Sequence, residues 1–150
     1  MDELFKEDEY FMRRALDQAQ RAFDEEEIPI GAVVVCNGKI IGKGYNQTEK
    51  LTDVTAHAEM IAITAAATEL GGKYLDECVL YVTIEPCVMC AGAIKHARFH
   101  KIVIGAREPK TGFSKYLSEE FNLKTELITG VLEDECRDMM QSFFRGRREK

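Results

Sequence analysis

The chain has 150 residues, 45% of them hydrophobic, which suffices for the core of one domain that we expect to span residues 1–150. No apolar run approaches the ~20 residues of a membrane span, and residues 1–8 lack the pattern of a secretory signal, so we expect a cytoplasmic protein without a membrane partner. Five cysteines, an odd number, favour a reducing compartment over a disulfide framework.

The formal net charge of −6 is unevenly distributed along the chain. Residues 1–27 carry ten acids and four bases, which leaves sixteen of each sign in the remainder. Within this remainder, basic residues cluster in a segment that we call the basic strip. Such a strip suits a phosphate backbone, although an ordinary solvated surface explains it equally well. Its members are Lys95, Arg98, Lys101, Arg107, Lys110 and Lys115, with further bases near the chain end at Arg145, Arg147, Arg148 and Lys150.

Hydrophobic periodicity predicts the elements in chain order, beginning with an amphipathic helix over residues 8–26. Two β-branched runs, 30–36 and 39–44, flank Asn37-Gly38 and predict a hairpin. The later elements are a helix from an N-cap at Thr55 to about Leu70, a strand over 78–84, a helix opened by Pro86 and reaching about Ala97, a strand over 101–105, a loop over 106–115, a strand over 125–131 and a helix over 132–148.

Strands alternate with helices after the hairpin, and a short extra helix is allowed before the last strand. This pattern predicts an α/β fold with three layers, α/β/α, in which helices cover both faces of a five-stranded mixed sheet. Functional sites in such sheets form outside the carboxyl ends of the strands. Two motifs rich in metal-ligating side chains lie close to such ends.

The motifs are His57-Ala58-Glu59 and Pro86-Cys87-Val88-Met89-Cys90. One imidazole and two thiolates leave the fourth tetrahedral position of a zinc ion open to water, whereas structural zinc sites are closed by protein. An open zinc lowers the pKa of its water from about 15.7 toward about 7. We therefore predict one Zn²⁺ per subunit bound by His57, Cys87 and Cys90, with Glu59 as the catalytic acid and base.

The spacing of these residues sets geometric conditions. Cys87 and Cys90 share one face of a helix, and its N-terminus favours their thiolates. His57 and Glu59 are about 200° apart on a regular helix, so both can serve one metal only if His57 lies at the first turn. We predict that two helix N-termini face each other across the zinc.

Two alternatives use the same cysteines. A lone Cys-x-x-Cys pair can be redox-active, and a closed structural site could add His96 and His100. His96 is about 240° around the helix from Cys90, so the closed site is disfavoured, and both histidines are expected at the surface or facing RNA. The other cysteines are expected in the core: Cys36, Cys78 and Cys136.

With these motifs the chain resembles the bacterial tRNA-specific adenosine deaminases of the cytidine-deaminase-like superfamily, a class already known for the His-x-Glu and Pro-Cys-x-x-Cys signature. The superfamily signature alone would also fit cytidine, guanine and riboflavin-pathway deaminases. The narrower resemblance runs nearly end to end and is carried by residues 28–33, 44–46, 55–59, 80–93, 105–107, 110–112 and 143–145.

The resemblance implies a cytidine-deaminase-like fold and a hydrolase acting on an amidine C–N bond. Its reaction would convert adenosine at wobble position 34 to inosine, on a tRNA anticodon stem-loop lying across a homodimer. Glu59 would move protons from water to the purine and the leaving ammonia. The implied substrate-binding residues are Asn46, the backbone of Ala58, Ile28, Ile84 and Arg107.

Plainer interpretations remain for some of these residues. Asn46 also fits a turn at a strand end, and Ile28 and Ile84 also fit the core. Glu85 suits either a group supporting the metal ligands or an ordinary loop residue before proline. The chain departs from the family pattern at Val54, where many relatives have Pro, at Glu108, where Asp is usual, and over 113–124, which is shorter than in some relatives. The last two departures fall where flanking nucleotides would be contacted.

Two rival functions remain open from the sequence. One is a deaminase of free guanine, cytosine or a nucleoside, and the other is a catalytically silent, zinc-stabilised interaction module. Glu59 argues against the second, because a structural site needs no carboxylate beside the metal.

Overall fold

The computed structural model describes residues 3–116 and 125–148. Residues 117–124, which include most of the shortened 113–124 stretch, lie outside this description, as does Lys150. The elements are α1 (Glu3–Asp24), β1 (Gly31–Cys36), β2 (Lys39–Tyr45), α2 (Ala58–Leu70), β3 (Cys78–Ile84), α3 (Val88–Ala97), β4 (Lys101–Ala106), α4 (Phe113–Tyr116), β5 (Glu126–Thr129) and α5 (Glu133–Arg148).

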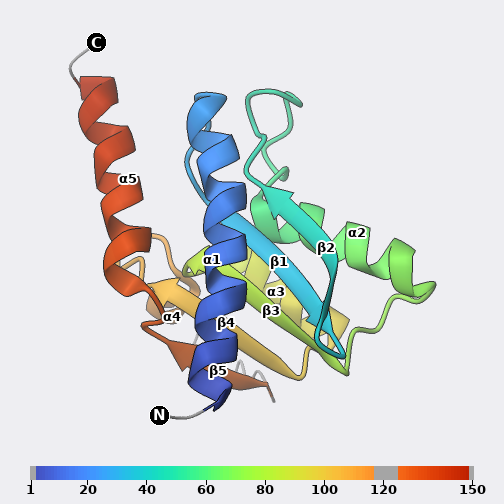
Figure 1. The fold of residues 1–150 in the computed structure, drawn as a ribbon. Helices are drawn as coiled ribbons and strands as arrows, with labels where there is room; N and C mark the ends of the chain where they lie inside the picture. Colours follow the sequence, from blue (N-terminus) through green and yellow to red (C-terminus); the bar gives the residue numbers. More distant parts are fainter. Residues whose placement is uncertain (1–2, 117–124, 149–150) are drawn as a thin grey trace.

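Five strands form one mixed sheet in the order β2-β1-β3-β4-β5 (Figure 1). β1 pairs antiparallel with both β2 and β3, whereas β3, β4 and β5 are parallel neighbours. The carboxyl ends of β2, β3 and β4 and the amino end of β1 therefore share one edge, which we call the site edge. The predicted five-stranded mixed sheet is confirmed.

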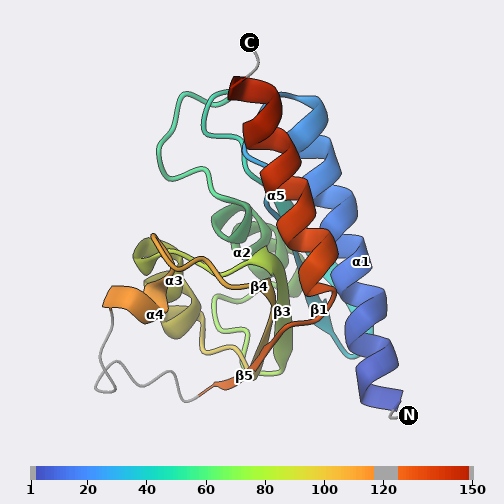
Figure 2. The same cartoon turned by 90° about the vertical axis from the view of Figure 1, so that its left-hand side faces the viewer.

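Helices cover the sheet on both faces, with α1 and α5 on one side and α2 and α3 on the other (Figure 2). Alternation along β1 builds both cores, because Val33 and Val35 pack beneath α1 while Ala32 and Val34 pack against α2 and α3. Every residue of β1 is buried. This explains why the strand reads as a continuous apolar run rather than an alternating one.

A close approach between β2 and α2 fixes where α2 begins. A side chain at Gly44 would collide with the carbonyl oxygen of Ala58 and come within 2.7 Å of the backbone nitrogen of Ala62. Only glycine therefore lets the first turn of α2 lie directly on the sheet. That turn carries the first of the two motifs.

The starts of α1, α2 and α3 differ from the prediction, and α1 ends at Asp24 rather than at residue 26. α1 begins at Glu3 rather than at residue 8. The prediction starts late because the first buried side chain of the helix is Asp8, and the apolar periodicity begins only there. The N-cap of α2 is His57 and not Thr55. The N-cap of α3 is Cys87, so Pro86 precedes the helix instead of occupying its first turn.

The side chain of Lys101 is mostly buried and forms an ion pair. Its ammonium lies 3.2 Å from both carboxylate oxygens of Asp8, which also accepts a hydrogen bond from the Tyr81 hydroxyl at 2.8 Å. The side chains of Lys101 and Asp8 are only 12% and 8% exposed. This ion pair joins α1 to β4 at the end of the sheet opposite the site edge.

Lys101→Ala is expected to lower the free energy of unfolding by about 2 to 3 kcal/mol, because it leaves a buried carboxylate with one partner fewer. Urea denaturation followed by circular dichroism measures the change. Arg13→Ala is the matched control, since Arg13 pairs with Glu135 at the surface and should contribute less than about 1 kcal/mol. Equal stability of the two variants would contradict a buried ion pair.

Within the described ranges, no helix combines the length and the apolar character needed to cross a membrane.

Candidate metal centre and catalytic carboxylate

His57, Cys87 and Cys90 converge at the site edge. The Nδ1 atom of His57 lies 3.6 Å from the sulfur of each cysteine. His57 and Cys87 are the N-cap residues of α2 and α3, and both have extended backbones, with ψ of 154° and 176°. The two helix N-termini therefore meet at these side chains, as predicted.

The N-cap position resolves the angular problem between His57 and Glu59. The N-cap residue does not have helical backbone geometry. The direction of its side chain therefore need not follow the 200° separation that a regular helix would impose. Glu59 lies in the first turn of α2 and is only 4% exposed. The imidazole and the carboxylate can thus face one centre.

The three ligand atoms fit a zinc ion. They lie within 4.8 Å of one another, and among the residues that the structure describes they are the only cluster of three or more His, Cys, Asp or Glu suited to a metal. Tetrahedral zinc with bonds of about 2.0 Å to nitrogen and about 2.3 Å to sulfur separates its ligands by about 3.5 to 3.8 Å. The 3.6 Å separations match this spacing.

The closed structural site is excluded. His100 donates its backbone N–H to Cys78 at the amino end of β3, whereas Cys87 lies beyond the carboxyl end of the same strand. His96 and His100 are both exposed, as expected. The remaining cysteines, Cys36, Cys78 and Cys136, are buried and free, which confirms their prediction as core residues.

Proton sharing within the metal-free trio is asymmetric. A hydrogen bond from Cys90, with a further one from His57, lowers the pKa of Cys87 to about 3. The same contact with Cys87, together with burial, raises the pKa of Cys90. The contact with Cys87 also raises the pKa of His57. Cys87 is therefore the more acidic of the two thiols, and a metal binds in competition with the protons of the site.

Burial dominates the environment of Glu59. It raises the pKa of the carboxyl to about 7, against the opposing hydrogen bond from its own backbone N–H. The side chain is removed from bulk water but lies beside His57 and the cysteines. A carboxyl group in such a place is suited to exchanging protons with a neighbouring reactant.

The predicted substrate-binding residues all lie at the site edge. Asn46 follows β2, and its N–H donates to the carbonyl oxygen of Ile30 at 3.1 Å. Ala58 opens α2 and is fully buried, whereas Ile28, just before β1, is 37% exposed. Ile84 ends β3 and belongs to the hydrophobic cluster beneath α1.

Arg107 follows β4 and is exposed at the same edge. Its guanidinium lies 3.7 Å from the carboxylate of Glu85. Lys110 and Lys115 are also exposed in the segment that follows. We call these three exposed residues the site-edge cations.

The predicted basic strip is wrong as a continuous surface. α3 leads from the carboxyl end of β3 back to the amino end of β4, so Arg98 and Lys101 lie at the end opposite the site edge. Arg98 lies 4.1 Å from the centre of the Tyr74 ring, and Lys101 is paired with Asp8. Arg98 and Lys101 are close to Arg107 in the sequence, but they lie at the opposite end of the sheet.

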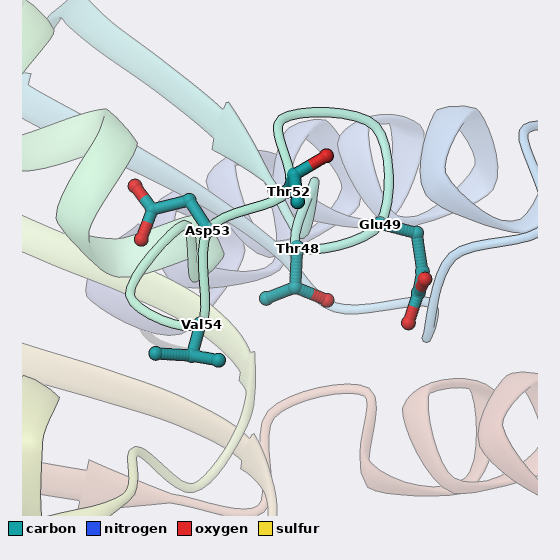
Figure 3. Close-up of a pocket in the computed structure, with 5 residues that line it drawn as sticks. All are labelled: Thr48, Glu49, Thr52, Asp53 and Val54. Carbon is teal, nitrogen blue, oxygen red and sulfur yellow. The ribbon is translucent and has the colours of Figure 1, made fainter.

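A hollow of about 430 Å³ opens in the loop that leads to His57 (Figure 3). Asp53 shapes this loop by accepting hydrogen bonds from the backbone N–H and the hydroxyl of Thr55, at 2.8 and 2.7 Å. Val54 is 85% exposed at its rim. The lining residues are Thr48, Glu49, Thr52, Asp53 and Val54.

Comparison with known proteins agrees with this geometry. Residues 5–106 match the family model described as the cytidine and deoxycytidylate deaminase zinc-binding region. The tRNA-specific adenosine deaminase of Bacillus subtilis (strain 168) is 45% identical, over 96% of this chain and 92% of that protein. The enzyme of the same name from Streptococcus pyogenes serotype M18 is 41% identical, over 97% and 94% of the two chains.

A solved structure from a study of A-to-I editing by tRNA:A34 deaminases has a TM-score of 0.81 and 38% identity, covering 87% of this chain and 98% of that one. A guanine deaminase from Nitrosomonas europaea has a TM-score of 0.82 at 23% identity, covering 90% and 83%, a likeness of fold alone. The chain therefore belongs to the bacterial tRNA-specific adenosine deaminases, within the zinc-binding cytidine and deoxycytidylate deaminase family.

Proposed function

We propose that this protein, in the cytoplasm, hydrolyses the C6–N bond of adenosine 34 in a tRNA anticodon loop, which releases ammonia and leaves inosine at that position of the tRNA. The observation that carries the proposal is the trio of His57, Cys87 and Cys90 beside the buried carboxyl of Glu59. The names of the relatives supply the substrate class. Water supplies the oxygen that replaces the amino group.

His57, Cys87 and Cys90 would hold a zinc ion, which when bound lowers the pKa of a coordinated water. Glu59 accepts a proton from the attacking water and delivers it to the purine ring, which makes C6 more electrophilic. It then carries the second proton to the departing amino group, so ammonia rather than an amide ion leaves. Burial of Glu59 keeps these transfers away from bulk water.

The target nucleoside is proposed to enter at the site edge. Asn46 and the backbone of Ala58 would contact it, and Ile28 and Ile84 would line the base pocket. The exposed side chain of Ile28 suits this role better than Ile84, which already packs in the core. An unpaired loop base enters such a pocket at smaller cost than a base taken from a duplex.

The phosphates on either side of the base are proposed to lie on the site-edge cations, Arg107, Lys110 and Lys115. Three contacts to a single strand give a slope of about −2 in a plot of log(kcat/KM) against log[salt]. We expect kcat/KM on an anticodon stem-loop to fall more than tenfold between about 50 and 200 mM salt. A flat response would remove these cations from RNA binding.

The direct test of the function is incubation of the zinc-loaded protein with an anticodon stem-loop that carries adenosine at position 34. Mass spectrometry should detect inosine at that position, and a stem-loop with guanosine there is the matched control. Free guanine and free cytosine form a second arm. Conversion of a free base without conversion of RNA would replace the proposed function by the rival one.

We also propose that the protein is a homodimer with the RNA across its subunit boundary. Val88 and Met89 lie between the two cysteine ligands and are 41% and 37% exposed, although the helix they open is otherwise mostly packed. Sedimentation should give about twice the chain mass of 17.0 kDa. Met89→Glu should shift the mass toward the monomer while zinc remains bound, and an unchanged mass would exclude this surface.

A further inference from the structure

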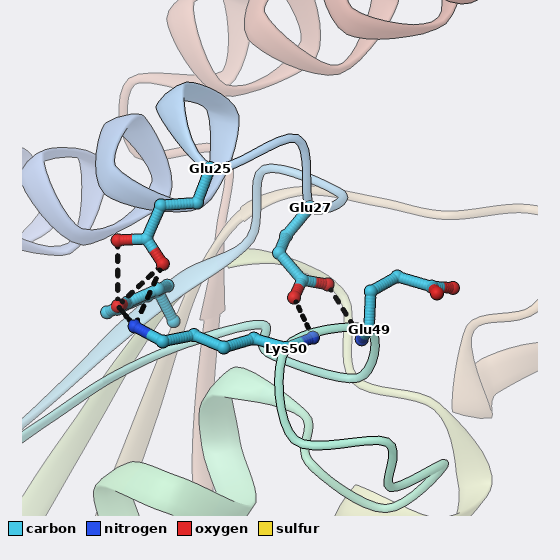
Figure 4. A network of polar contacts seen from close by, with 5 residues as sticks. Glu25, Glu27, Glu49 and Lys50 are labelled. Carbon is cyan, nitrogen blue, oxygen red and sulfur yellow. Dashed lines mark hydrogen bonds and ion pairs between the residues drawn. The ribbon is translucent and has the colours of Figure 1, made fainter.

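Glu27 joins two segments that are distant in the sequence. Its side chain is 2% exposed, and its two oxygens accept the backbone N–H groups of Glu49 and Lys50 at 3.1 and 2.8 Å (Figure 4). A second layer lies outside this contact, where the Lys50 ammonium is 3.2 Å from Glu25 and the Tyr45 hydroxyl donates to the same carboxylate. The connector after α1 thus holds the loop that follows β2.

Glu85 makes an equivalent set of contacts on another loop. Its fully buried carboxylate accepts the backbone N–H groups of Glu108 and Ser114, at 3.2 and 2.9 Å, and the Ser114 hydroxyl at 2.6 Å. Arg107 approaches the same group from outside, and a side chain on Gly112 would collide with it. The carboxylate therefore occupies the centre of this loop.

Both loops adjoin the metal ligands. The first, residues 46–57, runs from Asn46 to His57. The second, residues 107–114, begins at Arg107 and returns to the ligands where Phe113 donates its N–H to the carbonyl oxygen of Pro86, at 2.9 Å. We call them the histidine loop and the cysteine loop.

We propose that Glu27 and Glu85 are positioning residues, one for each loop, that hold the histidine loop and the cysteine loop in the shape that receives RNA. The proposal rests on the proposed function, because it assigns both loops to the substrate. Neither carboxylate needs to touch the RNA. Each acts through the backbone that it orders.

The chemistry of the contacts explains why both residues are acids. A buried carboxylate is costly unless it is hydrogen-bonded, and charge-assisted bonds to N–H groups are about twice as strong as neutral ones. Both partners of Glu27 are backbone groups, so its carboxylate fixes the path of the loop whatever side chains the loop carries. Glutamine has the same size but turns an NH₂ donor toward one of these N–H groups.

The test compares E27Q and E85Q with the wild type as zinc-loaded proteins. E69Q is the matched control, because it removes one negative charge at an exposed position at the far end of α2. Hydrogen exchange of single amides is read by NMR, and KM, kcat and zinc content are measured on the anticodon stem-loop assay.

We expect exchange at Glu49 and Lys50 to rise about tenfold in E27Q only, and exchange at Glu108 and Ser114 to rise similarly in E85Q only. KM should rise about tenfold in both variants, with kcat within about twofold of the wild type and zinc content unchanged. A general loss of structure would instead raise exchange throughout the chain and lower zinc content and kcat together.

Unchanged exchange at the four amides would overturn the proposal, and so would raised exchange with an unchanged KM. If E85Q does not fold, S114A removes only the hydroxyl donor, and the same amides should exchange several times faster. If E27Q does not fold, fast exchange of Glu49 and Lys50 in the wild type is the overturning result. The exchange measurements need no substrate, so failure of the RNA assay in the wild type would count against the proposed function alone.

Discussion

Glu59→Ala is expected to bind zinc and fold like the wild type while its deamination rate falls by several orders of magnitude, at least the hundredfold to ten-thousandfold typical of a lost general acid and base. The reason is positional: Glu59 is the buried carboxyl beside the trio, in the first turn of the helix that His57 caps. The rate is measured as inosine formed per unit time at saturating RNA, and zinc by elemental analysis.

The stability of the same variant carries further information. Burial raises the pKa of Glu59, so an ionised carboxylate is disfavoured at this place, and the relief of this cost should offset the cavity that the variant leaves and keep the unfolding midpoint close to that of the wild type. Glu69→Ala, an exposed change at the other end of α2, is the control and should match the wild type in rate. Near-normal turnover of Glu59→Ala would remove this residue from the mechanism.

Cys87→Ala is expected to lose both zinc and activity. The variant leaves one imidazole and one thiol, and it removes the cysteine whose pKa is lowered by its contacts with Cys90 and His57. Zinc should fall from about one per chain to near zero after dialysis against a weak chelator. The unfolding midpoint should then no longer respond to added zinc, because ligand binding stabilises only a fold that binds it.

Cys136→Ala is the matched control, since Cys136 is buried on α5 in the core beneath α1 and outside the metal cluster. It should lose some stability through its cavity but keep its zinc. Unchanged zinc in Cys87→Ala, or equal loss in both variants, would refute the predicted ligand set.

The sheet could be predicted because its signals are local. β1 is a β-branched run followed by Asn37-Gly38, and β3 and β4 are short apolar runs, so their identity did not depend on partners far along the chain. The same holds for the metal motifs, whose ligand types and spacing predict an open zinc site. The structure adds that both motifs lie on N-caps.

The predicted N-cap of α2 at Thr55 is wrong for a physical reason. Thr55 has the residue type that caps helices, but its hydroxyl donates to Asp53 in the loop before α2. His57 becomes the N-cap without any capping hydrogen bond from its side chain. The capping preference of Thr55 is therefore outweighed by the geometry of the loop, which places the imidazole of His57 beside the cysteines.

Tertiary structure also decides which charges are available. Glu25, Glu26 and Glu27 form a uniform acidic run in the sequence, yet only Glu27 is buried. Lys101 and Lys110 likewise cannot be told apart by residue type. Lys101 is in an ion pair at the far end of the sheet, whereas Lys110 is at the site edge. No periodicity in the chain distinguishes them, because the difference arises from the return of α3 across the sheet.

The most direct test of the central claim is X-ray absorption at the zinc edge of the zinc-loaded protein, with zinc-loaded Cys136→Ala as the comparison. An open site built by His57, Cys87 and Cys90 predicts two sulfur ligands at about 2.3 Å, one imidazole nitrogen at about 2.0 Å and one oxygen from water. Four protein ligands, or a shell that lacks either the imidazole or the paired sulfurs, would contradict it.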